Sequence, residues 1–360
     1  MKDFSIINKA PTHTPLIGIL ADDLTSAADG GAPFQRCGHT VTVLRGDITA
    51  PSDASTIWSA DCASRSLSEI DAATVTDKAA RSLAGASLLF KTIDSTLRGH
   101  IKAEISAAFT ASGRKRLVVA PAFPDAGRIT KDGVQYVHDI PVCQSSYAND
   151  PVHPARSSRI RDSLPADIAD ITILNAETQE ELTRKVAAIK EPENALWVGS
   201  PGLAMALADR FKQSPVTKAS LPPSRSILTV VGSANPVSRA QAKRTTQHGS
   251  VTCLMTPKQR SDNPDQALQD LVTKAMQQQA NFDTLIATGG DTMQAMLDRL
   301  KIKQFTLQGE LEPGFVLAKA KRADGTPLIL GMKAGGFGDE ESFLRAAQIL
   351  CSKQDVRQKQ

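Results

Sequence analysis

The sequence predicts an α/β fold built from two α/β domains with mainly parallel sheets and an interdomain cleft. Short apolar runs recur along the 360 residues, and helical patterns such as "EIDAATVTDKAARSLA" and "ETQEELTRKVAAIK" lie between them. Alternation of strand and helix is typical of parallel α/β layers. The apolar runs are continuous rather than alternating, which indicates strands that are covered on both faces.

The first part of the chain contains seven runs that we expect to be strands. They are "LIGILA" (16–21), "TVTVL" (40–44), "STIWSA" (55–60), "SLLFKTI" (87–93), "RLVVAPA" (116–122), "DITIL" (170–174) and "ALWVG" (195–199). Residues 211–225 contain three prolines and no apolar periodicity, and we expect a linker there. The strands expected after it are "SILTVVGS" (226–233), "TCLM" (252–255), "DTLIATGG" (283–290) and "PLILGMKAGG" (327–336). The predicted domains are therefore residues 1–215 and 216–360, because a chain of this length exceeds what one core usually serves.

The composition excludes several classes of protein. The formal net charge is only +4 and aromatic residues make up 4%, which disfavours a nucleic-acid partner. No apolar run reaches the roughly 18 residues of a membrane span, and the N-terminus lacks the apolar core of a secretory signal. The five cysteines have no CxxC spacing, so no zinc or redox motif is indicated. We expect a cytoplasmic protein that acts on small acidic ligands.

Two adjacent acids, Asp22 and Asp23, follow the first expected strand. Aspartate is a preferred helix N-cap, so one of the two is explained by the helix that follows. The surplus carboxylate has three open roles: accepting bonds from substrate hydroxyls, acting as a general base, or helping to hold Mg²⁺.

The segment "KTIDSTLRGH" after the fourth strand places Lys91, Asp94, Ser95 and Arg98 within eight residues. An arginine binds a carboxylate through two nitrogens, and aspartate and serine exchange hydrogen bonds with hydroxyls. This mixture indicates a hydroxy-acid ligand. The competing interpretation is that Asp94 or Ser95 only caps a helix and Arg98 lies on a solvated face.

Two further segments carry weaker signals. Arg128 and Lys131 add positive charge to a proline- and glycine-containing loop that could equally be a rigid turn. Ser200 and Gly202 follow the seventh strand, where close packing of helix on sheet is at least as good an explanation as ligand contact.

The C-terminal part has three glycine-containing turns, each after an expected strand. Glycine lets backbone N–H groups approach a ligand closely, and helix N-termini attract phosphate. Neither G-x-x-x-x-G-K-[ST] nor G-x-G-x-x-G occurs, so the turns are neither a P-loop nor a standard dinucleotide fingerprint. The candidate nucleotide-binding residues in these turns are Ser233, Gly289, Gly290, Asp291, Thr292, Gly335 and Gly336.

Taken in order, eight blocks resemble the four-carbon acid sugar kinase family. They are "ADDLTSAAD", "KTIDSTLRGH", "PAFPDAGRITKDGVQY", "GSPGLA", "VVGSANPVS", "ATGGDT", "GELEPG" and "KAGGFG". The resemblance implies an N-terminal domain that binds a sugar acid such as threonate, erythronate or 3-oxo-tetronate. It also implies a C-terminal domain that binds ATP with Mg²⁺, and phosphorylation of a terminal hydroxyl in the cleft between the domains. On this basis Asp22 and Asp23 are expected to be catalytic, and Lys91, Asp94, Ser95 and Arg98 to bind the acid.

The chain departs from the family pattern at two places. Ser26 stands where glycine is usual, and Gly232-Ser233-Ala234-Asn235 stands where Gly-Ser-Cys-Ser is more common. Three alternatives stay open: a kinase of the same family for a branched or oxidised acid such as 3-oxo-isoapionate, a nucleotide-binding sensor without catalysis, and a dinucleotide-dependent oxidoreductase. A homodimer is common for enzymes of this size, but no feature of the sequence indicates one.

Overall fold

The computed structural model describes residues 17–48, 56–150, 152–213, 223–233, 235–246, 249, 251–257, 263–278, 282–312, 314–333, 335 and 337–351. All eleven runs predicted as strands contain one. The main elements of the N-terminal part are β1 (Ile17–Ala21), α1 (Leu24–Arg36), β2 (Thr40–Arg45), β3 (Thr56–Asp61), α2 (Glu69–Leu83), β4 (Leu88–Thr92), α3 (Ile101–Ser112), β5 (Arg116–Ala120), β9 (Ile171–Ile173), α4 (Gln179–Ala188), β10 (Ala195–Gly199) and α5 (Pro201–Arg210).

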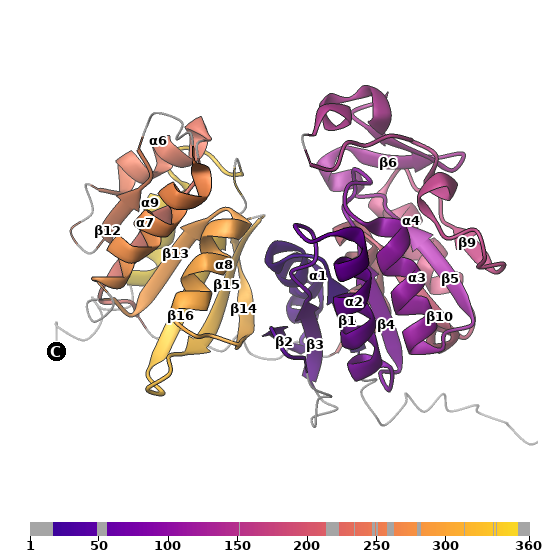
Figure 1. Ribbon diagram of the computed structural model, residues 1–360, viewed down its shortest axis with the longest axis horizontal. Helices are drawn as coiled ribbons and strands as arrows, with labels where there is room; N and C mark the ends of the chain where they lie inside the picture. Colours follow the sequence, from indigo (N-terminus) through magenta and orange to yellow (C-terminus); the bar gives the residue numbers. More distant parts are fainter. Residues whose placement is uncertain are drawn as a thin grey trace, which may run out of the picture.

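The C-terminal part repeats the alternation and then changes to antiparallel strands (Figure 1). Its elements are β11 (Ile227–Val231), α6 (Pro236–Thr245), β12 (Val251–Met255), α7 (Pro264–Met276), β13 (Thr284–Thr288), α8 (Gly290–Arg299), β14 (Gln304–Glu312), β15 (Phe315–Lys321), β16 (Pro327–Lys333) and α9 (Ser342–Cys351). The predicted domain boundary at residue 215 lies outside the described residues, as does most of the predicted linker.

In the described part of the chain, one 13-stranded sheet runs through both halves in the order β12-β11-β13-β16-β15-β14-β2-β3-β1-β4-β10-β5-β9. Within this sheet the strands of the N-terminal half pair in parallel with one another, whereas β14 pairs antiparallel with β15 and with β2. The sequence predicts two α/β domains but not this continuity. The β14–β15 hairpin was not predicted either, although its apolar residues are separated by a Pro-Gly pair.

Helices cover both faces of the sheet. On one face, α1, α4, α5, α7 and α8 bury one hydrophobic core that extends through both halves. On the other face, α2 and α3 cover the N-terminal strands, and α6 and α9 cover the C-terminal ones. The shared core therefore places α1 directly against β14 of the C-terminal half (Figure 1).

Arg45, at the end of β2, is buried at this junction and binds residues of both halves. Its side chain is 8% exposed and lies 3.4 Å from the Asp61 carboxylate of its own half. Across the junction it donates hydrogen bonds to Ile302 O at 3.1 Å and to Asp298 Oδ1 at 2.9 Å. Burial raises the pKa of Asp61 to about 6, and Arg45 opposes that rise.

A small antiparallel sheet lies beside the carboxyl ends of the N-terminal strands. Its strands are β6 (Arg128–Lys131), β7 (Val134–Val137) and β8 (Ile140–Pro141). Short 3₁₀ turns accompany it: η1 (Pro124–Ala126), η2 (Val142–Gln144), η3 (Ser146–Asn149), η4 (Ile160–Ser163) and, farther along, η5 (Pro192–Asn194). The segment expected to be a stiff loop is thus partly sheet.

Candidate active site

The two adjacent acids at the end of β1 share one partner, Arg65, which follows β3. The Nε atom of Arg65 donates a hydrogen bond to Asp22 Oδ2 at 2.8 Å, and Nη2 lies 2.7 Å from the same oxygen. Its Nη1 lies 2.6 Å from Asp23 Oδ2. Since β1 and β3 are parallel neighbours, their carboxyl ends bring these three side chains to one edge of the sheet.

Asp22 and Asp23 differ in burial and in hydrogen bonding. Asp23 Oδ1 accepts a hydrogen bond of 2.6 Å from the Ser26 N–H, which makes Asp23 the N-cap of α1. Asp22 is 4% exposed. Burial alone would raise the pKa of Asp22, but the charges of Arg65 and Lys91 outweigh it and lower that pKa. Burial raises the pKa of Asp23, and the charge of Asp22 raises it further. Asp22 is therefore the surplus carboxylate, held in its charged form.

The segment after β4 does not cap the next helix. Helix α3 begins at Ile101 with His100 in the N-cap position, so Asp94 and Ser95 belong to a loop of their own. Asp94 Oδ2 accepts a hydrogen bond of 2.5 Å from Arg98 Nε. The helix-cap interpretation of Asp94 and Ser95 is therefore excluded, and the ligand interpretation stays a prediction.

Arg98 is held from two further directions. Its Nη1 donates to Asp150 Oδ2 at 2.9 Å, and its guanidinium carbon lies 4.9 Å from the centre of the Tyr147 ring. The Asp150 carboxylate also accepts backbone N–H bonds from Val152 and His153. The hydrogen bond from the His153 backbone N–H lowers the pKa of Asp150 and outweighs burial, which would raise it. These contacts fix the guanidinium plane before any ligand arrives.

Lys91 requires a correction. Its side chain is 1% exposed, and its ammonium lies 2.8 Å from Glu104 Oε2 and donates to Thr92 O at 2.8 Å. Lys91 therefore lies beneath the site, where its charge lowers the pKa of Asp22. The predicted direct contact between Lys91 and a substrate carboxylate is replaced by a supporting position.

A cavity of about 220 Å³ lies where these strand ends meet the small sheet. Asp23, Asp94, Ser95, Arg65 and Arg98 are among the residues that line it. Arg128 of β6 also lines this cavity, whereas Lys131 is exposed and only 3.9 Å from Glu177. Acids, a hydroxyl and several guanidinium groups thus surround one small space, which is the arrangement that a hydroxy acid needs.

Ser200 and Gly202 serve packing. Ser200 is fully buried, and its hydroxyl donates to Ala122 O at 2.9 Å. A Cβ on Gly202 would lie 2.3 Å from the same carbonyl oxygen. The structure therefore supports the interpretation of close helix packing at this turn.

The C-terminal half presents its glycine turn to α1. Gly289 has φ +90°, a conformation that L side chains rarely adopt. A Cβ on Gly290 would lie 3.0 Å from Thr25 Oγ1. Helix α8 begins at Gly290, so its first backbone N–H groups lie at this contact, as an anion site requires. Asp291 is exposed and lines a second cavity, of about 260 Å³, together with Asp22.

The other candidate nucleotide residues are distributed around this turn. Thr292 is 4% exposed and packs against Gly232, where an added Cβ would lie 2.2 Å from Thr292 Oγ1. Ser233 Oγ accepts a hydrogen bond from Asn235 N–H at 3.1 Å, and it would lie 3.8 Å from a Cβ on Gly335. Thr292 thus supports the turn from inside, while Ser233 and Gly335 lie close together. Gly336 lies outside the described residues.

Sequence reasoning missed three residues at the site. Arg65 stands four residues after β3, so the rule that selected the ends of the first and fourth strands would have selected it too. Asp150 was missed because it lies far along the chain, in the loop after η3. Asp29 lies within the block "ADDLTSAAD", and no role was predicted for it. It lines both the first cavity and the space between α1 and the glycine turn.

Two family models match parts of this chain. Residues 17–172 match the family model described as "Sugar-binding N-terminal domain", and residues 256–343 match "Nucleotide-binding C-terminal domain". Both matches contain candidate residues from the corresponding side of the site. None of the described helices is long and apolar enough to cross a membrane.

Several curated relatives align over most of the chain. A D-threonate kinase of Bordetella bronchiseptica is 31% identical over 404 residues, covering 93% of this chain and 98% of the relative. A 3-oxo-tetronate kinase of Burkholderia multivorans is 24% identical and covers 95% of this chain and 99% of the relative. A D-erythronate kinase of Heliobacterium modesticaldum is 30% identical over 271 residues, covering 66% of this chain and 62% of the relative.

Solved structures with this fold include a Haemophilus influenzae protein and a Salmonella typhimurium protein. Their TM-scores are 0.74 and 0.78 at 19% and 18% identity, and they cover 93% and 94% of this chain. The likeness extends over 100% and 99% of those chains. At this level of identity, the agreement concerns the fold.

Proposed function

The chain belongs to the four-carbon acid sugar kinase family, and on that premise we propose that it transfers the γ-phosphoryl group of ATP to the terminal hydroxyl of a four-carbon sugar acid. The acids named by its relatives are threonate, erythronate and 3-oxo-tetronate. The observation that carries the proposal is the first cavity. It combines fixed guanidinium groups with carboxylate and hydroxyl acceptors, and it lies next to the glycine turn of the other half.

Arg98 and Arg128 are proposed to bind the substrate carboxylate. Arg98 is oriented by Asp94 and Asp150, so little of its freedom remains to be lost on binding. Arg128 lines the same cavity and donates to Tyr147 Oη at 3.2 Å. Two guanidinium groups on one carboxylate also explain how the site distinguishes a sugar acid from a neutral sugar.

Asp22 and Asp23 are proposed to act on the acceptor hydroxyl, in agreement with their position beside the carboxyl-end cavities. Arg65 holds both acids in place, and Asp94 and Ser95 are proposed to bind the remaining hydroxyls. Asp22 in its charged form provides an acceptor whose protonation state is constant near neutral pH. This division assigns the acids and hydroxyl to the substrate and leaves the glycine turns to the nucleotide.

The nucleotide is proposed to bind at the C-terminal turns, with its phosphates on the first backbone N–H groups of α8, from Gly290 on, because the Gly289 N–H already donates to Lys333 O at 3.0 Å. The close approach of Gly290 to Thr25 provides a passage too narrow for a side chain, which suits a backbone cradle. Burial lowers the pKa of Lys333, which lines the same space, to about 8, against the opposing charge of Glu312. Its ammonium would be stabilised by a nearby phosphate.

Mg²⁺ fits this arrangement through Asp291. Among the described residues, no group of three or more His, Cys, Asp or Glu side chains could hold a metal ion. Mg²⁺ bound to a nucleotide usually takes one or two carboxylates together with phosphates and water, so a single exposed carboxylate beside the glycine turn is sufficient. The ion would neutralise charge on the β- and γ-phosphates.

A coupled ADP-release assay tests the proposal. Purified protein with Mg·ATP is given a panel of four- and five-carbon sugar acids, with the matching neutral sugars as controls. We expect ADP release with at least one four-carbon acid and none above background with the neutral sugars. If no acid stimulates ADP release while ATP still binds, the proposed function is wrong and the chain is a nucleotide-binding protein without this activity.

A further inference from the structure

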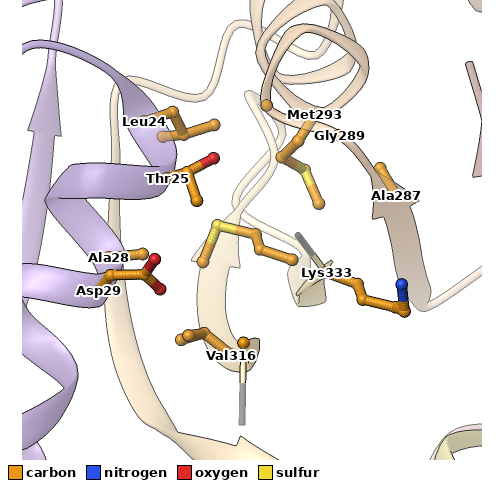
Figure 2. A pocket seen from close by; sticks show the side chains of 12 residues that line it. Leu24, Thr25, Ala28, Asp29, Ala287, Gly289, Met293, Val316 and Lys333 are labelled. Carbon is orange, nitrogen blue, oxygen red and sulfur yellow. The ribbon is translucent and has the colours of Figure 1, made fainter. Parts of the chain in front are cut away.

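Asp29 occupies a place between the two proposed ligands. It lies on α1 one turn after Thr25, and these two residues line both the sugar-acid cavity and the space next to Gly289 and Gly290. Figure 2 shows the Asp29 carboxylate projecting from α1 into that space, with Gly289 on the far side. That space holds only about 10 Å³, so an acceptor hydroxyl would reach Asp29 from the first cavity, and the γ-phosphate would meet it at the rim where Thr25 faces Gly290.

The Asp29 carboxylate is not engaged by the protein. Within the described ranges, no hydrogen bond or ion pair to its carboxylate is found, whereas Asp22 and Asp23 are both bound to Arg65. Asp23 additionally accepts the capping bond from Ser26. A proton acceptor must have an oxygen available to the group that it deprotonates, and of the three acids on this edge Asp29 meets that condition best.

The surroundings of Asp29 favour proton uptake. Burial, first, and then the charges of Glu310 and Asp23 raise its pKa to about 7, against the opposing charge of Arg36. A general base works best when its pKa lies near the working pH. Asp22 has a lowered pKa and is a weaker base.

The charged groups around Asp29 come from several elements. They are Asp23 and Arg36 on its own helix and at its cap, Glu310 on β14, Lys333 on β16, and Arg65, Asp94, Arg98 and Arg128 across the first cavity. Arg36 is paired with Glu310, and Arg65 with the two acids before α1. Of the charges that act on the pKa of Asp29, those of Glu310 and Asp23 outweigh that of Arg36.

We propose that Asp29 is the general base of this kinase and accepts the proton of the sugar-acid hydroxyl as that oxygen attacks the γ-phosphorus. The inference rests on the proposed function. The O–H bond of the substrate breaks and its proton passes to an Asp29 oxygen. A bond forms between the substrate oxygen and the γ-phosphorus, and the bond from that phosphorus to the bridging oxygen breaks. The electron pair leaves with ADP, and Asp29 later releases its proton to solvent.

This assignment gives the three acids at and before the first turns of α1 different roles. Asp22 and Asp23 hold the acceptor hydroxyl through a geometry fixed by Arg65, and Asp29 takes the proton. The sequence prediction that Asp22 or Asp23 is the base is the competing hypothesis. The two hypotheses differ in which carboxylate controls the acidic side of the pH–rate profile.

The test compares wild type, Asp29→Asn and Glu310→Gln in pH profiles of kcat/KM for the best sugar acid. In wild type, kcat/KM should rise with pH through a pKa near 7, because the charged form of Asp29 is the active one. D29N should lose about 10²- to 10⁴-fold in kcat and should lose this rise, while its Kd for Mg·ATP changes little. E310Q should stay active and move the rise to lower pH, because one charge that raises the pKa of Asp29 is removed. Asp77→Asn, on the exposed side of α2, is the matched control and should leave the profile unchanged.

Two results would overturn the inference. One is a D29N variant that keeps wild-type kcat and the same pH dependence. The other is an E310Q variant with an unshifted profile while Asp23→Asn abolishes the rise. In both cases the wild-type enzyme still phosphorylates a sugar acid, so the failure is distinct from failure of the proposed function, in which wild type itself releases no ADP.

Discussion

Lys91 and Glu104 form an ion pair of 2.8 Å in which the two side chains are only 1% and 3% exposed. The pair joins the carboxyl end of β4 to the first turn of α3, and the charge of Lys91 acts on Asp22. Burial alone would lower the pKa of Lys91, but Glu104 and Asp22 outweigh burial and raise it. The pair therefore stays charged at neutral pH, and it supports the floor of the site.

A variant that lacks one member of this pair should unfold more easily than wild type. Glu104→Gln leaves the Lys91 charge buried with one strong partner fewer, so we expect a loss of about 3–5 kcal/mol in the free energy of unfolding. Replacement of both, Lys91→Met with Glu104→Leu, should cost clearly less. Urea denaturation measures the free energy of unfolding of wild type, the single variant and the double variant. D77N, at an exposed position, serves as the control. Equal losses in the single and double variants would contradict this account.

Arg65 is expected to be essential for turnover because it binds both Asp22 and Asp23. Arg65→Lys keeps the charge but cannot bind both acids with the same geometry, so it should lower kcat/KM for the sugar acid by roughly 10- to 100-fold. Arg65→Met should lower it further and raise the pKa of Asp22. ATP affinity should change little in either variant. Lys131→Met, at an exposed position on β6, is the control, and an R65K variant with full activity would exclude the positioning role.

Asp29 should make folding stability depend on pH. The folded-state pKa of about 7 lies above the ordinary value of 3.8. As pH rises from about 4 to 7, the unfolded chain loses this proton while the folded chain keeps it, so stability falls over that window and the loss is complete above pH 7. D29N should remove this contribution and be more stable than wild type at pH 8, on the order of 2–4 kcal/mol, with a much smaller difference at pH 4.

Thermal or urea unfolding at several pH values measures this difference without any substrate. The result is thus independent of the activity assay. A difference between D29N and wild type that does not grow with pH would show that Asp29 does not hold a proton in the folded state.

Gly290 should tolerate no side chain while Thr25 faces it. Gly290→Ala places a methyl group 3.0 Å from Thr25 Oγ1 in the present arrangement, so the Thr25 side chain must give by a few tenths of an ångström. We expect about a tenfold loss in kcat/KM for ATP. The double variant Thr25→Ala with Gly290→Ala removes the contact and should recover most of the lost kcat/KM. No recovery would mean that the methyl group acts on the nucleotide phosphates rather than through Thr25.

Local patterns predict much of this fold. Continuous apolar runs located the strands of the large sheet other than β14 and β15, and the rule that ligands bind at the carboxyl ends of parallel strands selected Asp22, Asp23, Asp94, Ser95 and Arg98. The β14–β15 hairpin lacks a following helix, so the alternation that revealed the other strands gave no signal there.

The remaining features depend on long-range contacts. The role of Lys91 depends on Glu104, which lies on a different element, and burial cannot be read from "KTIDSTLRGH" alone. The pKa of Asp29 depends partly on Glu310, which is 281 residues away in the chain. Pairing of β14 with β2 likewise joins segments whose relation no local pattern encodes.

The pairing of β2 with β14 has a consequence for any attempt to separate the halves. Cutting the chain between them would turn both strands into edges with unpaired backbone N–H and C=O groups. The β2 segment "TVTVLR" is β-branched and apolar, with its only charge at the end, which is the composition that promotes strand addition between molecules. Each half isolated on its own would therefore be exposed to aggregation through this edge. The sugar-acid and nucleotide halves protect one another from self-association, in addition to completing one site.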